Sequence, residues 1–287
     1  MLKVSTHDGK FHPDEIFACV LLNWMVKESK PYFARTRKPE RIEKYKNDPE
    51  FYVIDVGGEY DESKLVFDHH HSTFDVKGEN GDLLSSCGLI WKYLLKNEKF
   101  LKDNNVTDFI KEKVTEFTIM VDRHDNGVEY APELEFVSLF NFSKSYNKFF
   151  NAYKSAEAYF ENKLALWRHL EEMSLLEDNA LNEASNGIIF CDERISVNEK
   201  LNASDNKLLV CKRNDAEYSI TSLNQGTEVD FTVRCPAPIE WAGKFDDSIK
   251  EYDESLVFSH KNRFMTIVKG DKNDAMRIAN IIINAQG

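Results

Sequence analysis

The stretch LVFDHHHSTFD, residues 65–75, places an aspartate and three consecutive histidines directly after a short apolar run. Histidine is the most common nitrogen ligand of divalent metals in proteins, and aspartate supplies the oxygen ligand that often accompanies it. A polar loop would explain an isolated pair of histidines equally well. The metal interpretation therefore depends on whether other parts of the chain carry similar residues at equivalent places.

Short apolar segments alternate with helical patterns through the first half of the chain. The predicted strands are residues 2–5, 32–36, 51–56 and 65–68, and the predicted helices are residues 16–26, 39–46, 85–95 and 109–127. This alternation predicts an α/β fold with a doubly wound, mostly parallel sheet. Ligands of such sheets bind beyond the carboxyl ends of the strands, which is where residues 68–71 would lie.

The second half of the chain has a different pattern. Residues 149–186 keep an apolar stripe at helical spacing, which predicts a helical connector after a first domain of residues 1–148. From residue 187 onward, six short strand-like runs alternate with turns and end in the apolar-faced helix DAMRIANIIINA, residues 274–285. This pattern predicts a smaller α+β domain over residues 187–287.

Composition limits the classes of function. The 287 residues carry a formal net charge of −12, which argues against broad, nonspecific binding to a nucleic-acid backbone. A small basic groove, or a site in which metal ions supply the positive charge, stays open. Five scattered cysteines without a CxxC pair, no leader-like start and no apolar segment near 20 residues predict a cytoplasmic protein without membrane association.

Two further clusters follow the first and third predicted strands. THDGKFHPDE, residues 6–15, contains two histidines and two acids: His7, His12, Asp14 and Glu15. Its acids also suit an ordinary helix start, where the helix dipole favours negative charge. In FYVIDVGGEYD, residues 51–61, Asp55 lies inside an apolar strand, where an unpaired charge is costly unless it binds something.

The last cluster lies in IMVDRHDNG, residues 119–127. Asp122 closes an apolar helical run, and Asp125 follows three residues later on the same helical face, although it could equally be a turn residue. Four such clusters could reach one crevice and hold a pair of metal ions, which together activate a bridging water and stabilise a phosphoryl transition state. The chain contains no GxSxG, Walker A or GxGxxG motif that would favour another chemistry.

In their order and spacing, THDGKFHPDE, DVGGEYD, DHH, SSCGLIW and DNG closely resemble the melanocyte proliferating gene one family of the DHH phosphoesterase superfamily. FTVRCPAPIEWAGK and SLVFSH extend this resemblance over nearly the whole chain. The resemblance implies a DHH-type fold in which an N-terminal domain carries the metals and a C-terminal domain closes over the substrate phosphate. It also implies a metal-dependent phosphoesterase, with RNA 3′–5′ exonuclease activity attributed to eukaryotic members.

The resemblance assigns roles to the residues that match the family's motifs. The implied metal ligands are His7, His12, Asp14, Asp55, His69 and Asp122. The implied catalytic residues are Asp68, His69 and His70, with His70 positioning or stabilising the scissile phosphate. Asp125 and His71 are additional candidates, and His71 stands where the family usually has Gln. The expected cofactor is Mn²⁺, with Mg²⁺ or Zn²⁺ as alternatives, bound as two ions.

The C-terminal block departs from the family's pattern. RFMTIVKG, residues 263–270, stands in place of a glycine-rich GFIGG. Without these glycines, side chains rather than backbone would contact the substrate phosphate, and the candidates are His260, Lys261, Arg263 and Arg234. A solvated basic turn is the plain alternative for this segment.

The sequence therefore predicts a metal-dependent phosphoesterase that cleaves RNA or short oligonucleotides. A phosphodiesterase for small nucleotides and a pyrophosphatase are the nearest alternatives. A noncatalytic, metal-binding regulatory protein is a third, although such a protein would be expected to lack a ligand, and every expected acid and histidine is present. The sequence does not predict the oligomeric state.

Overall fold

The computed structural model describes residues 1–226 and 232–286. The chain divides into two compact units, Met1–Arg168 and His169–Gly287. The division falls inside the long helix α7 (Lys148–Asn182), in the segment predicted to connect two domains. We propose that the first domain ends at residue 148 and that the second begins at residue 187.

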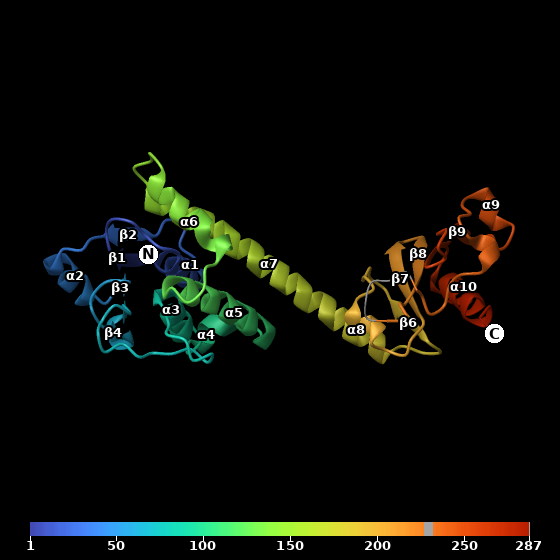
Figure 1. The fold of residues 1–287 in the computed structure, drawn as a ribbon, viewed down its shortest axis with the longest axis horizontal. Coiled ribbons are helices and arrows are strands. Elements are labelled where there is room, and N and C mark those ends of the chain that lie inside the picture. The colour runs from blue at the N-terminus through green and yellow to red at the C-terminus, as the bar shows by residue number, and fades with distance from the viewer. Residues whose placement is uncertain (227–231, 287) are drawn as a thin grey trace. The chain divides into compact units, whose positions relative to one another are not determined.

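A five-stranded sheet with the strand order β2-β1-β3-β5-β4 forms the centre of the N-terminal unit (Figure 1). Its strands are β1 (Lys3–Thr6), β2 (Tyr32–Arg35), β3 (Phe51–Ile54), β4 (Tyr60–Asp61) and β5 (Val66–Phe67). The pairs are parallel except β4 with β5. The chain adds β2 on one side of β1 and β3 on the other, so the winding direction reverses between β1 and β3. The predicted α/β fold with a mostly parallel sheet is confirmed.

Most helices of this unit pack around α1, eleven of whose fourteen residues are buried, whereas α2 packs against β3. The helices are α1 (Pro13–Val26), α2 (Pro39–Lys46), α3 (Ser86–Leu94), α4 (Glu98–Asp103), α5 (Asp108–Asp125) and α6 (Glu135–Leu139). Phe17 of α1 meets Phe117 of α5 edge to face, with ring centroids 4.9 Å apart. The elements α4, α6 and β4 were not predicted, because segments of two to six residues carry little periodicity.

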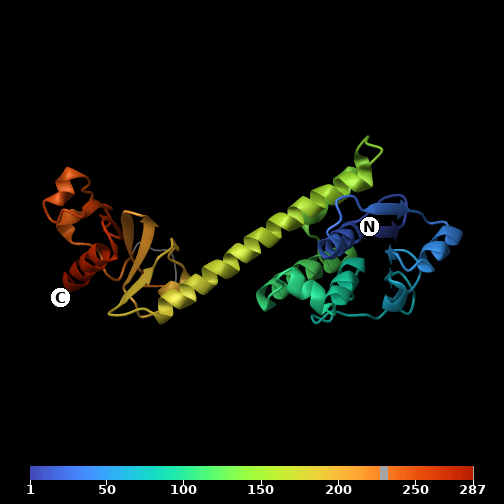
Figure 2. The same cartoon turned by 180° about the vertical axis from the view of Figure 1, so that it is seen from behind.

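The first turns of α7 belong to the N-terminal unit and lie beside its sheet (Figure 2). Phe149 packs against Phe33 of β2 with ring centroids 5.1 Å apart. The buried stripe continues along α7 through Tyr153, Ala156 and Phe160, as the sequence pattern predicts. No helix within residues 1–226 and 232–286 combines the length and the apolar character needed to cross a membrane.

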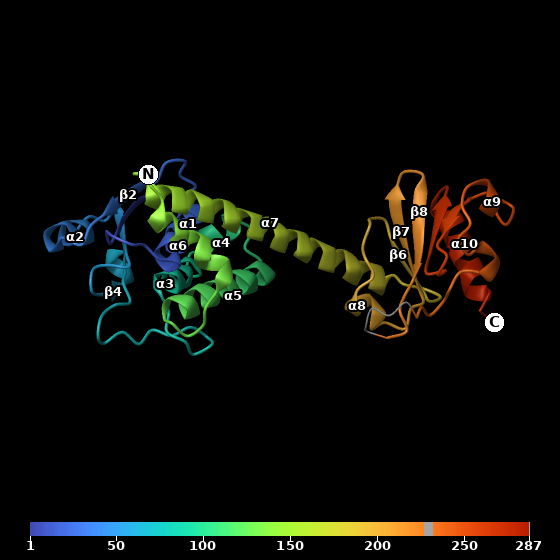
Figure 3. The same ribbon diagram turned by 45° about the horizontal axis from the view of Figure 1, so that its top comes forward.

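The C-terminal unit contains a second five-stranded sheet, ordered β6-β7-β8-β10-β9, in which only β6 and β7 pair in parallel (Figure 3). Its strands are β6 (Ile188–Cys191), β7 (Leu208–Asn214), β8 (Glu217–Ser222), β9 (Leu256–Ser259) and β10 (Met265–Lys269). Its helices are α8 (Glu199–Asn202), α9 (Asp247–Lys250) and α10 (Lys272–Asn284). Together they form the predicted α+β arrangement.

Alternating side chains give this sheet two apolar faces. Leu208 and Val210 of β7 share a core with α10, whereas Leu209 and Cys211 share another with α8 and the end of α7. The run DFTVRC, predicted as a strand, has its first two residues outside those that the structure describes. Its described remainder forms no strand but a single bridge between Asn224 and Val233.

Candidate metal centre

The carboxyl ends of three neighbouring parallel strands deliver the predicted site residues to one edge of the N-terminal sheet. His7 follows β1, Asp55 follows β3, and the DHH segment, residues 68–70, follows β5. Since β1, β3 and β5 are adjacent in the sheet, side chains far apart in sequence meet there. The site therefore lies where the winding reverses, the place at which open α/β sheets bind ligands.

His7 is buried between two carboxylates. Its Nε2 lies 3.0 Å from Glu15 Oε1 and 3.0 Å from Asp55 Oδ2, and its Nδ1 lies 3.0 Å from the carbonyl oxygen of Asp8. Burial would lower the pKa of His7, but the bonds to Asp55 and Glu15 raise it to about 10. The same Nδ1 lies 2.9 Å from Nη2 of Arg37, so contacts with Asp8 and Arg37 on this nitrogen leave Nε2 facing the carboxylates, the orientation that a metal-ligating histidine requires.

Asp55 occupies a strained backbone position at the end of β3. Its φ of 57° lies in the left-handed region, which non-glycine residues rarely adopt and which is often found at functional sites. Ser86, in the first turn of α3, donates to the Phe67 carbonyl oxygen at 3.0 Å and approaches Asp55 Oδ1 at 3.5 Å. Although burial opposes ionisation, the bonds from His7 and His70 hold the pKa of Asp55 below its usual range.

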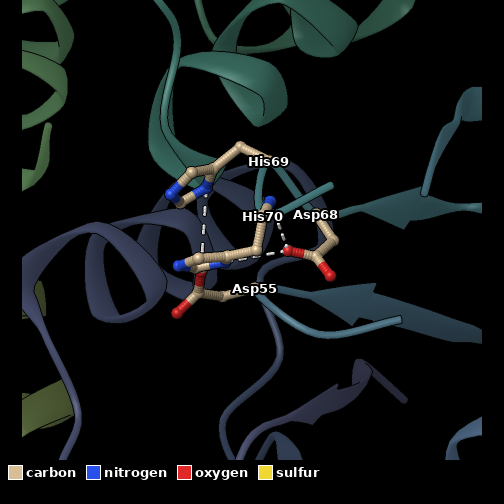
Figure 4. Close-up of side chains that lie close together, drawn as sticks. All are labelled: Asp55, Asp68, His69 and His70. Atoms are coloured by element: carbon tan, nitrogen blue, oxygen red, sulfur yellow. Dashed lines mark hydrogen bonds and ion pairs between the residues drawn. The ribbon is translucent and has the colours of Figure 1, made fainter. Parts of the chain in front are cut away.

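The two histidines that follow Asp68, His69 and His70, differ in their contacts and in their exposure to solvent (Figure 4). Asp68 is buried and accepts from the backbone N–H of Gly58 at 2.6 Å and from that of His70 at 3.0 Å. The His70 Nδ1 lies 3.0 Å from Asp68 and 3.2 Å from Asp55, and these bonds raise the pKa of His70 to about 10. The His70 side chain is 59% exposed, whereas that of His69 is only 8% exposed.

Asp14 is the least compensated carboxylate in the described part of the chain. It is fully buried, and neither of its oxygens has a hydrogen-bond partner. Burial raises its pKa well above the usual value, and the negative charge of Asp55 raises it further. The ligand atoms of His12, Asp14 and Asp125 lie within 4.8 Å of one another, and Asp125 Oδ2 is 3.1 Å from His69 Nε2.

The structure brings nine residues of the N-terminal unit into three groups with metal-ligand spacing. These groups are His7, Glu15 and Asp55; His12, Asp14 and Asp125; and Asp55, Asp68, His69 and His70. Asp55 belongs to two of them. The donors are five carboxylates and four imidazoles, which is a mixture that suits Mn²⁺, Mg²⁺ or Zn²⁺.

Asp122 lies outside these groups and contacts the start of α3. Its Oδ1 accepts from the Ser85 N–H at 2.9 Å, from the Ser85 hydroxyl at 2.6 Å and from the Gly88 N–H at 3.0 Å. Its Oδ2 is buried without a hydrogen-bond partner. Burial raises the pKa of Asp122 to about 7, against the effect of the bonds from Ser85. Asp122 thus caps a helix from a neighbouring element, while Asp125, one turn later, reaches the acid and histidine cluster.

The remaining predicted residues lie elsewhere. His71 is not in any of the three groups, and its Nδ1 lies 3.1 Å from the Thr73 hydroxyl. In the C-terminal unit, His260, Lys261 and Arg263 share the turn between β9 and β10. The guanidinium of Arg234 instead binds the backbone carbonyls of three residues: Asn202, Ser204 and Asn206.

Glu15 and Ser86 contribute to the site without having been selected from the sequence as site residues. Glu15 also follows Pro13 and Asp14 at the start of α1, so its carboxylate was accounted for by the helix dipole. The structure shows that it bonds His7 and the hydroxyl of Thr6 as well. Its signal was proximity to two histidines in a ten-residue segment. A serine such as Ser86 carries no comparable signal.

The arrangement of these motifs matches a known protein family. A model of the family MYG1_exonuc, described as an uncharacterised protein family (UPF0160), matches residues 3–283. This chain belongs to that family. The resemblance predicted from the motifs is thereby confirmed over nearly the full length.

Relatives from distant organisms share this family. The MYG1 protein of Dictyostelium discoideum is 28% identical over 309 residues, which cover 92% of this chain and 91% of that protein. The MYG1 protein of Chlamydia trachomatis is 25% identical over 300 residues, which cover 92% of this chain and 91% of that protein. The mouse MYG1 exonuclease is 34% identical over 148 residues, which cover 46% of this chain and only 37% of the mouse protein.

Solved structures show a weaker likeness. A pGpG-specific phosphodiesterase, PggH, from Vibrio is 12% identical with a TM-score of 0.32, and the match covers 100% of this chain and 99% of that one. RecJ from Thermus thermophilus, solved with Mn²⁺, is 12% identical with a TM-score of 0.27, over 99% of this chain and 52% of RecJ.

Proposed function

We propose that this protein is a divalent-metal-dependent phosphoesterase acting on RNA or short oligonucleotides. The observation that carries the proposal is the buried cluster around Asp14, whose two carboxylate oxygens have no protein partner. An isolated buried carboxylate costs several kcal/mol unless a cation or hydrogen bonds compensate it. The Asp55, Asp125 and Glu15 carboxylates nearby make an uncompensated arrangement still less favourable.

The residues present fit a pair of divalent cations. His12, Asp14 and Asp125 would hold one, and His7 with Asp55 would hold the other, while His69 lies next to both groups through Asp125 and Asp55. Asp122 stays a ligand candidate from the sequence, but its Oδ1 is occupied by the start of α3. Two such cations supply Lewis-acid stabilisation of a phosphoryl group and lower the pKa of water.

The protein's own side chains then orient the site. The Asp8 carbonyl oxygen contacts Nδ1 of His7, and the Ser86 hydroxyl contacts Nδ1 of His69. These contacts orient each ring so that its Nε2 faces the cluster. Asp68 binds both the backbone and the ring of His70, so this half-exposed imidazole is held at the mouth of the cluster. There it donates a charge-assisted hydrogen bond to the scissile phosphate and orients it.

The substrate class rests on the family. Relatives in mouse, rat, cattle and human carry the name MYG1 exonuclease, which supports a nucleic-acid substrate and an exonuclease reaction here. The 3′–5′ direction is the one that the motif resemblance implies. The net charge of −12 favours a short substrate over a long duplex. In the C-terminal unit, His260, Lys261 and Arg263 are the proposed contacts to the substrate phosphate, and Arg234 is a weaker candidate because carbonyl groups already bind its guanidinium.

Hydrolysis of RNA labelled at its 5′ end tests the proposal directly. With Mn²⁺, purified protein is expected to shorten the RNA from the 3′ end, and both chelator and the substitution His69→Ala are expected to abolish this shortening. His169→Ala, which removes an exposed histidine of α7, is the matched control and should retain activity. Turnover restricted to dinucleotides or pyrophosphate would move the substrate to small molecules. Measured metal binding without turnover of any of these substrates would favour a regulatory protein.

A further inference from the structure

A cavity of about 610 Å³ lies in the N-terminal unit beside the start of α7. Six aromatic side chains line it: Phe11, Tyr32, Phe33, Tyr146, Phe149 and Phe150. Its charged lining residues are Arg35 and Lys148, and no aspartate or glutamate lines it. In a chain with 49 acidic residues, a wall that combines aromatic rings with cations alone has the composition of a site for an aromatic, anionic ligand.

The side chains of the inner wall pack closely on one another. Phe149 packs edge to face on Phe11, with ring centroids 5.5 Å apart, and also contacts Phe33. The Arg35 guanidinium lies over the Phe149 ring at 4.5 Å and over the Phe11 ring at 5.3 Å. These contacts hold the cation in place, so a ligand that enters the cavity meets a preorganised surface.

The outer wall exposes aromatic rings to water. Tyr146 is fully exposed, Tyr32 is 50% exposed and Phe150 is 38% exposed. Scattered exposed apolar side chains are common, but three rings around one cavity form a patch that a ligand can cover. Each ring offers a flat face to which a nucleobase can stack, whatever its sequence.

One loop connects the cavity with the proposed metal centre. Gly9 and Phe11 line the cavity and belong to the loop that joins His7 to His12. The side-chain amide of Asn141 binds both the N–H and the carbonyl of Phe11, at 3.1 and 2.9 Å, and so ties this loop to the segment before α7. Arg35 itself extends to within 3.8 Å of Glu15 Oε1.

We propose that this cavity binds one nucleobase of a single-stranded substrate, next to the phosphate that is cleaved. This inference rests on the proposed function and adds to it the part of the protein that recognises the nucleotide. The base stacks on Tyr146 and Phe150. Lys148 donates one N–H to the Asn141 carbonyl at 2.9 Å, and its two remaining donors contact the backbone phosphate beside the base. Because stacking is tolerant of sequence, the cavity holds the strand without selecting a particular base.

Binding is measured in the absence of hydrolysis, so that the contribution of the cavity is distinguished from that of the metal centre. The affinity of purified protein is measured in chelator for a five-nucleotide RNA and for an abasic oligonucleotide with the same number of phosphates. The uncompensated acid cluster repels both probes alike, so the difference between them reports the bases. Wild-type protein is expected to bind the RNA about tenfold more tightly, and the double substitution Tyr146→Ala and Phe150→Ala is expected to remove this preference.

The control is Phe142→Ala, because this ring is 78% exposed in the same segment but does not line the cavity. The control should keep the preference for RNA. Equal affinity of the wild type for both probes, or a preference that survives the double substitution, would overturn the inference. Hydrolysis of the same RNA with Mn²⁺ is measured separately. Absence of hydrolysis with an intact preference contradicts the proposed function and leaves the base site standing.

Discussion

Buried charge distinguishes the two units of this molecule. In the N-terminal unit, six acidic or histidine side chains are buried: His7, Asp14, Glu15, Asp55, Asp68 and Asp122. In the described part of the C-terminal unit, the buried polar side chains are neutral: Asn202, Ser222, Ser259 and Thr266. Since burying a charge costs several kcal/mol without compensation, ordinary packing avoids it. The contrast is the one that the proposed metal centre predicts, because bound cations would compensate the buried charges of the N-terminal unit.

The two units also differ in how a carboxylate caps a helix. The N-terminus of α10 in the C-terminal unit is capped locally by Asp271, which accepts from Asn273 and Asp274. The N-terminus of α3 is capped by its own Ser85 and also by Asp122, a carboxylate 34 residues beyond Gly88 on another helix. Local capping stabilises one helix, whereas this long-range cap also fixes the position of Ser86 against Asp55 and His69.

Removal of a shared carboxylate should have the largest effect. Asp55→Asn takes a negative charge from two of the three groups, so we expect hydrolysis of RNA to fall by more than about a hundredfold, the upper range for outer-shell partners of a metal. Steady-state rates with saturating Mn²⁺ measure the loss. Asp75→Asn, on an exposed side chain of the same unit, is the control. Equal rates for Asp55→Asn and wild type would contradict the proposal that the buried charges of the N-terminal unit bind metal.

Gly88→Ala tests the long-range cap of α3. A Cβ at this position would clash with Asp122 Oδ2, so the carboxylate must move and lose bonds to α3. Overpacking of this kind should lower the free energy of unfolding by about 3 kcal/mol, despite the better helix propensity of alanine. Denaturant unfolding measures the change. If the clash is the cause, Gly88→Ala should cost clearly less in a background that already carries Asp122→Ala.

Divalent metal should stabilise one unit and not the other. At a free Mn²⁺ concentration one hundred times the dissociation constant, binding contributes about 2.7 kcal/mol to the stability of the folded state. Hydrogen exchange should therefore slow within residues 1–168 and stay unchanged in the strands β6 to β10. The effect should reverse with chelator. Uniform slowing in both units, or none, would contradict the assignment of buried charge to metal binding.

The surface ion pair of the C-terminal unit should have the smallest effect. Arg277 bonds Asp253 and holds the pKa of this carboxyl below its usual range. Such a depressed pKa stabilises the folded state above about pH 4, and the stabilisation is lost as the pH falls through the folded pKa. Because the pair is solvent-exposed, Arg277→Gln should cost at most about 1 kcal/mol at pH 7.

Hydrogen exchange in α10 at pH 7 and at pH 3 measures this effect. The difference between Arg277→Gln and wild type should shrink at pH 3. Arg213→Gln, which changes an exposed arginine of β7, should match the wild type at both pH values. A loss for Arg277→Gln that is as large at pH 3 as at pH 7 would show that the pair acts through packing and not through the charge of Asp253.

In the N-terminal unit, the succession of β1, β2, β3 and β5 with α1, α2, α3 and α5 could be predicted from the sequence. Apolar segments of four to six residues alternate with helical periodicity, and this pattern leads to a parallel sheet without further information. The clusters at the ends of the first, third and fourth predicted strands follow from the same pattern, since parallel strands present their carboxyl ends at one edge. His7, Asp55 and His69 therefore meet where the sequence places them.

Tertiary packing decided which acids join the cluster. Asp122 and Asp125 lie on one face of α5, but they differ by about 4.5 Å along the helix axis. The packing of α5 against α3 directs the first carboxylate to the Gly88 N–H and the second to His69. Likewise, Glu15 enters the site because α1 begins directly beside β1, while His71 turns away to Thr73.

The sequence by itself thus determined the sheet of the N-terminal unit, the edge at which the acids and histidines gather, and the types of residue found there. The tertiary structure decided between candidates one helical turn or one residue apart, and it assembled the aromatic cavity from segments more than a hundred residues apart, such as Phe11 and Phe149. The physical reason is that sequence periodicity is local, whereas the site depends on contacts between distant segments. Periodicity records which face of an element is buried, whereas the position of that face to within a few ångströms depends on the elements packed against it.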